Sequence, residues 1–457
     1  MIRTSAALLL KAISRDSYKE TSREYSGTLR GRVKVVAITD VIIYAYICHR
    51  EERVMRILII GGNGFIGKPL VRQLNEQEHS VAVFHRDKGK AARPAEVEEI
   101  IGDRRELGNY RGAIREFAPD VVIDLILSSG KQAEELIETV RGVGSTAGNH
   151  RLKSVLPRIV AISSMDVYRA CGVFHGSEPG PLEPLPLTEE SPLRKTTQTY
   201  PVERLQQLQS VFGWIDEAYD KVAVERAIGS ASDVFEFQSE AEAGRYAAHP
   251  HPPLPKGEAK SSRFGNGGIS ATILRLPMVY GPGDHLRRFF PIVKRIEDRR
   301  PAILYSEAVA AWRSPRGYVE NVAAAIALAA TSSQAAGRIY NVAEQESFSE
   351  LEWAKKVADR MGWQGRFVVL PRERIPENLQ TPGNFAQHWV ASSDRIRREL
   401  GYEEIVKTNE AIRRTIEWER RTPPLETGLS TLDYAAEDSA LAKLPLSSEM
   451  PWAKDLT

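Results

Sequence analysis

One short stretch, residues 55–67, most constrains what this chain can fold into. It reads MRILIIGGNGFIG. Residues 57–60 are apolar and rich in isoleucine, as in a buried strand, and they run directly into a glycine-rich turn. A helix-compatible segment, residues 68–74, follows. Strand, glycine turn and helix in this order are typical of the first crossover of a dinucleotide-binding fold. We therefore predict an α/β fold, a doubly wound parallel sheet.

Each glycine of the turn has a separate physical role. Gly61 permits the tight turn, Gly64 lets a pyrophosphate approach the backbone, and Gly67 lets the helix pack close to the strand. Free N–H groups at the helix start then face the phosphates. Phe65 and Ile66 lie inside the motif, so we predict that these five residues bind the cofactor.

The spacing G-x-x-G-x-x-G, with Phe65 and Ile66 inside it, resembles that of the extended short-chain dehydrogenase/reductase superfamily, and in particular the NAD-dependent epimerase/dehydratase family. The resemblance covers about residues 55–424 and is interrupted by residues 229–268. It implies a smaller C-terminal α/β lobe beside the dinucleotide domain, with a small-molecule substrate between the two.

Bulk composition excludes several classes of protein. The chain has 457 residues and a net charge of +2, which indicates no nucleic-acid partner. Two cysteines exclude a disulfide framework and a cysteine-rich zinc site, and we expect no metal. Since no apolar stretch reaches about 18 residues, we expect no membrane span and a cytoplasmic protein. The sequence is compatible with a homodimer.

The strand and helix rhythm divides the chain into segments. The expected segments are an N-terminal extension outside the core (1–54), the dinucleotide domain (55–228), a disordered insertion (229–268), the last strand of the dinucleotide domain (269–284), a region that is mainly the substrate lobe (285–424) and a mobile tail (425–457).

Two positions bear on the choice of cofactor. Arg86 follows the second predicted strand, where an acid would bind the ribose 2′-hydroxyl of NAD and an arginine would accommodate the 2′-phosphate of NADP. Arg86 favours NADP, whereas the adjacent Asp87 leaves NAD as the alternative. The family resemblance implies that Asp103 accepts a hydrogen bond from the adenine amino group.

The resemblance also implies the catalytic residues. The segment SSMDVY, residues 163–168, is similar to the superfamily's S-[ST]-x-x-V-Y, which makes Ser164 the hydroxyl that polarises the substrate oxygen. The superfamily's Y-x-x-x-K helix matches at Lys221, which would hold the cofactor ribose. However, the tyrosine position of that motif is Glu217, and Tyr219 is two residues before Lys221, about 200° around a helix.

Three arrangements can supply the missing proton-transfer group. The helix can begin after Tyr219 and free its ring to turn inward, Glu217 can itself act as the acid or base, or Tyr200 can serve from a preceding loop.

Further along the chain, residues 275–284 resemble the stretch of the family that passes the nicotinamide, which places Pro277 at the cofactor. Residues 316–323 resemble R-[DG]-[FY]-V-x-[DN]-V-A, in which Arg316 would face a substrate anion. The glycine-rich lead-in of nucleotide-sugar enzymes is replaced by SEAVAA at residues 306–311, which argues against such a substrate.

The predicted function is therefore an NAD(P)-dependent epimerase, dehydratase or reductase that transfers hydride on a sugar-like or hydroxylated small molecule. The alternative is a non-catalytic NAD(P)-binding protein with a regulatory or RNA-binding role.

Overall fold

The computed structural model describes residues 54–86, 96–144, 156–197, 199–232, 269–424 and 432–444. The predicted extension, residues 1–54, lies outside this part of the chain except for its last residue, and so does nearly all of the predicted insertion.

The described residues form one seven-stranded parallel sheet in the order β10-β6-β5-β4-β1-β2-β3. This sheet confirms the predicted doubly wound fold. Its strands are β1 (Arg56–Ile60), β2 (Ser80–His85), β3 (Glu98–Ile101), β4 (Val121–Asp124), β5 (Arg158–Ser164), β6 (Ala271–Leu276) and β10 (Ile339–Asn341).

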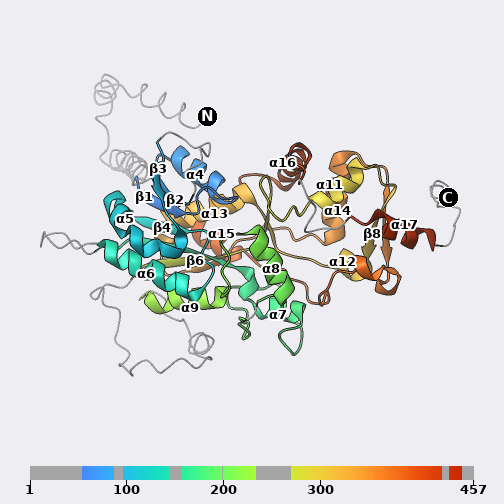
Figure 1. Cartoon of the computed structure of the whole chain (residues 1–457), viewed down its shortest axis with the longest axis horizontal. Helices are drawn as coiled ribbons and strands as arrows, with labels where there is room; N and C mark the ends of the chain where they lie inside the picture. The colour runs from blue at the N-terminus through green and yellow to red at the C-terminus, as the bar shows by residue number, and fades with distance from the viewer. Residues whose placement is uncertain are drawn as a thin grey trace, which may run out of the picture. The chain divides into compact units, whose positions relative to one another are not determined.

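Alternate residues of each central strand face opposite sides of the sheet, and helices cover both sides. Ile57 and Ile59 of β1 pack in one apolar cluster with α4 (Gly67–Glu76) and α13 (Val319–Thr331). Leu58 and Ile60 pack on the other side, where further helices cover the sheet (Figure 1). These are α5 (Arg111–Phe117), α6 (Gly130–Gly144) and α9 (Lys221–Ala231). A strand that is buried on both faces explains the unbroken apolar run in the sequence.

Most of the remaining elements build the C-terminal lobe, which Figure 1 shows to the right of the central sheet, whereas α15 (Asp394–Leu400) packs on β10. Two small sheets pair β7 (Met278–Tyr280) with β9 (Arg316–Tyr318) and β8 (Ala302–Ser306) with β11 (Arg366–Leu370). The helices are α7 (Arg169–His175), α8 (Val202–Val211), α11 (Phe290–Glu297), α12 (Glu307–Ala311), α14 (Glu350–Met361), α15 (Asp394–Leu400), α16 (Thr408–Arg421) and α17 (Tyr434–Ala442). Short 3₁₀ turns are η1 (Arg104–Tyr110), η2 (Met165–Val167), η3 (Ser333–Ala335), η4 (Arg372–Arg374) and η5 (Glu377–Leu379).

The structure corrects the predicted boundary at residue 284. Strand β10 pairs with β6, and α13 packs on α4, so both elements belong to the dinucleotide domain although they lie beyond residue 284. The sequence pattern indicates a strand at residues 338–342, but so short a segment carries no signal of the sheet that it joins.

The predicted tail is also partly folded. Helix α17 lies within it, and Glu437, which is 2% exposed, bonds to Arg295 of α11. Asp438 pairs with Arg300, and the Tyr434 hydroxyl donates to Asp298 at 2.6 Å. These contacts are mainly charged, so apolar periodicity did not reveal the helix.

Candidate active site at the carboxyl ends of the strands

The glycine turn has the geometry that a dinucleotide requires. Gly61 has a φ of +85°, which favours glycine, and its carbonyl accepts from the N–H of Gly64 at 3.0 Å. A Cβ on Gly67 would lie 2.5 Å from the carbonyl oxygens of Gly61 and Gly62, so helix α4 can begin here only with glycine. The turn also lies between β1 and its neighbours β2 and β4, where the strand order reverses.

Within the described residues, the backbone N–H groups of Phe65 and Ile66 have no hydrogen-bond acceptor. They lie at the start of α4, where the helix dipole favours an anion. Phe65 contacts the loop after β7, since a Cβ on Gly283 would lie 3.2 Å from its ring. The residues present therefore fit a dinucleotide pyrophosphate.

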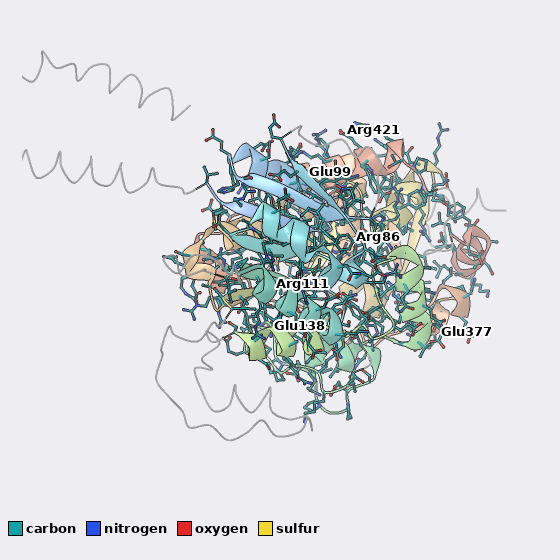
Figure 2. All side chains as sticks on the ribbon, turned by 60° about the vertical axis from the view of Figure 1, so that its left-hand side comes forward. Arg86, Glu99, Arg111, Glu138, Glu377 and Arg421 are labelled. Carbon is teal, nitrogen blue, oxygen red and sulfur yellow. The ribbon has the colours of Figure 1, made fainter. Side chains whose placement is uncertain are left out.

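The predicted adenosine residues lie on neighbouring strand ends. Arg86 follows β2 and is exposed (Figure 2). Asp103 follows β3. The hydrogen bonds from Arg105 lower the pKa of Asp103 to about 2. Asp103 therefore caps η1 as a carboxylate, and contact of Asp103 with adenine stays a prediction.

Ser164 is the last residue of β5, and its hydroxyl accepts from the N–H of Asp166 at 3.2 Å. Asp166 belongs to η2 and is 1% exposed. One of its carboxylate oxygens, Oδ2, accepts from Tyr219 at 2.7 Å and from Tyr200 at 3.0 Å. Two of the three candidate proton-transfer groups thus converge on one carboxylate next to Ser164.

Helix α9 begins at Lys221, later than the Y-x-x-x-K comparison assumes. Asp220 is its N-cap and accepts from the N–H of Val222 at 3.0 Å. Tyr219 therefore lies in the preceding loop and turns inward, while Glu217 is exposed. Of the arrangements that the sequence leaves open, the structure shows the one in which the helix begins after Tyr219, and Asp220 is the sequence signal that could have placed its start.

Lys221 is 3% exposed and donates to the carbonyl oxygens of Leu127 and Ile162, the latter at 3.0 Å. Burial lowers the pKa of Lys221 to about 8. Its Nζ lies 5.9 Å from the ring centre of Tyr219. Burial and the nearby Asp166 raise the pKa of Tyr219 well above its usual value, so this phenol keeps its proton at neutral pH.

Sequence reasoning missed Asp166, although it lies inside the SSMDVY segment. Its role becomes visible only when the fold brings residues 200 and 219 to it. Glu225, which matches the acid after the family's lysine, lies in the core instead and pairs with Arg275 at 2.7 Å.

The two remaining predicted residues lie on the lobe side. Pro277 separates β6 from β7 and contacts β9, since a Cβ on Gly317 would lie 2.9 Å from its ring. Arg316 is 8% exposed, and its Nη2 donates to both carboxylate oxygens of Glu350 at 2.6 and 2.7 Å. The guanidinium lies 5.1 Å from the ring centre of Trp353.

This fold and the glycine turn define a dinucleotide-binding protein. The model of the NAD dependent epimerase/dehydratase family matches residues 57–222 and 261–343. The chain belongs to this family. This match confirms the family that the sequence resembles, and the seven-stranded parallel sheet confirms the predicted fold.

Known relatives support the fold. The 2′-dehydrokanamycin reductase of Streptomyces kanamyceticus is 33% identical over 99 residues, which span 22% of this chain and 28% of the reductase. DesIV, a dTDP-glucose 4,6-dehydratase from Streptomyces venezuelae solved with NAD and TYD, is 18% identical, with a TM-score of 0.52 over 82% of this chain and 100% of that one. The dTDP-glucose 4,6-dehydratase of Bacillus anthracis, solved with NAD, is 13% identical, with a TM-score of 0.51 over 82% of this chain and 99% of that one.

Membership of this family supports an NAD-dependent enzyme of the oxidoreductase type. No helix in the described ranges is long and apolar enough to cross a membrane.

Proposed function

We propose that this protein is a dinucleotide-dependent reductase of a carbonyl group on a sugar-like, polyhydroxylated small molecule. The observation that carries the proposal is the Tyr219–Asp166 hydrogen bond of 2.7 Å beside Ser164 and Lys221. A bound nicotinamide dinucleotide supplies the hydride.

The protein's own residues supply the proton. In the free site the Tyr219 hydroxyl donates its one proton to Asp166. To act as the acid, the hydroxyl turns this proton to the oxygen that gains negative charge as the carbonyl is reduced, and solvent water then restores the proton of the phenol. Asp166 holds the phenol in place, and Tyr200 donates to the same oxygen of that carboxylate. The Ser164 hydroxyl stabilises the developing charge.

The residues of the lobe that would face the substrate favour a substrate without a diphosphate. The family resemblance predicts that Arg316 faces a substrate anion. In the structure, however, the guanidinium of Arg316 donates to both carboxylate oxygens of Glu350. The positive charge is thus already compensated. Helix α12, which contains residues 307–311, replaces the glycine-rich segment of nucleotide-sugar enzymes. A neutral or cationic sugar derivative fits this lobe better than a nucleotide sugar.

Arg86 supports NADPH as the preferred cofactor, since it is exposed at the end of β2 and has no ion-pair partner among the described residues. A guanidinium at this position can bind a 2′-phosphate through two hydrogen bonds.

The test compares Tyr219→Phe with Glu217→Gln. Both residues are candidates for the proton-transfer group from the sequence, and Glu217 is exposed. NADPH oxidation is followed with a panel of keto sugars and keto derivatives of amino sugars. We expect Tyr219→Phe to lower kcat by about 10²–10⁴-fold and Glu217→Gln to leave it unchanged. Full turnover in Tyr219→Phe, or no oxidation with any compound, would overturn the proposal.

A further inference from the structure

Residues 212–216, here called the strap, connect α8 to the loop before α9 and cross the carboxyl edge of the sheet. Gln209 of α8 holds the far end of the strap, since its side-chain amide donates to the carbonyl of Asp216 at 3.1 Å. The strap therefore has a defined path, and its members contact residues at several positions around the dinucleotide site.

At the adenosine end, the strap meets the residue that we expect to bind the 2′-phosphate. A Cβ on Gly213 would lie 3.8 Å from Nη2 of Arg86. Figure 2 shows Arg86 near α8, in agreement with this contact. Phe212 packs edge-on against His285, with ring centres 5.8 Å apart, and His285 packs against Phe65 of the glycine turn.

At its far end, Asp216, the strap is anchored to the segment after β4. The Ser129 hydroxyl donates to a carboxylate oxygen of Asp216 at 2.7 Å. The N–H of Asp216 donates in turn to the Ser128 hydroxyl at 3.3 Å. Both serines are buried at the carboxyl end of the sheet.

At the nicotinamide end, Trp214 lies over the lysine that we expect to hold the ribose. Nζ of Lys221 is 5.7 Å from the ring centre of Trp214 and 5.9 Å from that of Tyr219. The strap thus contacts residues after β2 and β4 and the start of α9, and reaches Phe65 after β1 through His285; these positions surround a dinucleotide in this fold.

We propose that the strap is the outer wall of the dinucleotide site, closed over the bound cofactor by the Ser129–Asp216 bond, with Trp214 against the nicotinamide end. This inference rests on the proposed dinucleotide binding. It assigns specific roles to Trp214, Asp216 and Ser129, and it requires the strap to open before a cofactor can enter or leave.

Energy transfer from tryptophan to bound NADPH tests the position of Trp214. We expect Trp214→Phe to remove most of the transfer signal. Trp363→Phe is the matched control, because Trp363 lies in the C-terminal lobe, where it donates to the carbonyl of Arg300. Equal signals in Trp214→Phe and wild type would place Trp214 away from the nicotinamide.

Stopped-flow measurement of NADPH binding tests the closure. Ser129→Ala removes the donor that holds Asp216, and we expect association and dissociation to become about tenfold faster with a small change in Kd. Circular dichroism checks that the variant folds. The strap proposal is overturned if a folded Ser129→Ala variant binds and releases NADPH at wild-type rates and Trp214→Phe keeps the wild-type energy-transfer signal. The proposed function would still stand. If calorimetry detects no binding of NADPH or NADH to the wild type, both proposals fail.

Discussion

The buried pair between Glu225 and Arg275 offers a stringent test of how the active-site helix is held. Arg275 is 1% exposed, and its Nε and Nη2 donate to the two carboxylate oxygens of Glu225 at 3.0 and 2.7 Å. The Ser163 hydroxyl donates to the same carboxylate at 2.6 Å. The pair therefore joins α9 to β5 and β6, the elements that position Lys221 and Ser164.

The variant Glu225→Gln keeps the size of the side chain and removes its charge. A glutamine amide supplies one acceptor oxygen and one NH₂ group, so in either orientation an NH₂ faces an N–H donor of Arg275. Removing one partner of a buried pair leaves a charge without compensation, which costs about 3–5 kcal/mol. We expect the free energy of unfolding to fall by that amount.

Urea denaturation followed by tryptophan fluorescence measures the loss. Glu417→Gln is the control, because Glu417 pairs with Arg413 along α16 with both side chains over a third exposed. That change should cost only about 0.3–0.5 kcal/mol. A double variant, Glu225→Met with Arg275→Met, should lose less than the sum of its two single variants. A loss below about 1 kcal/mol for Glu225→Gln would refute this account.

Four further predictions follow from the site and the lobe. Arg86→Ala should weaken NADPH binding by about 1.5–3 kcal/mol and leave NADH nearly unchanged in calorimetry; equal losses would contradict the assignment. Gly67→Ala should abolish dinucleotide binding, since its Cβ would meet two carbonyl oxygens at 2.5 Å, and normal affinity in the variant would exclude the turn as the site. Because burial lowers the pKa of Lys221 to about 8 from 10.5, the folded chain binds fewer protons than the unfolded chain between these values, so stability should rise with pH there; Lys221→Met should remove this rise in urea titrations at each pH. Glu437→Gln should release α17 to limited proteolysis by weakening its bond to Arg295, and unchanged cleavage would show that other contacts hold the helix.

The central strands could be predicted from sequence because the burial of each strand is visible in its own consecutive residues. Residues 57–60 and 271–276 are buried on both faces of the sheet, and an unbroken apolar run is the direct consequence. The glycine turn was equally clear, since the crowding at Gly67 admits no side chain.

The proton-transfer group could not be chosen from sequence alone. Its position depends on where α9 begins, and that depends on the cap formed by Asp220. The meeting of Tyr200, Tyr219 and Asp166 brings together residues up to 53 positions apart in the sequence. Helix α17 was missed because charged contacts with α11 hold it, and such contacts leave no periodic pattern.

The position of β10 at the edge of the sheet has a consequence for synthesis of the chain. Strand β10 ends at Asn341, after the chain has passed through α11, β8 and α12 of the lobe. A nascent chain that has just emerged as far as residue 284 therefore carries β6 with an open edge and α4 without its cover, α13. Such an edge is a template for aggregation. We expect a fragment that stops at residue 284 to be insoluble and one that extends past α15 to be the shortest that keeps the sheet covered.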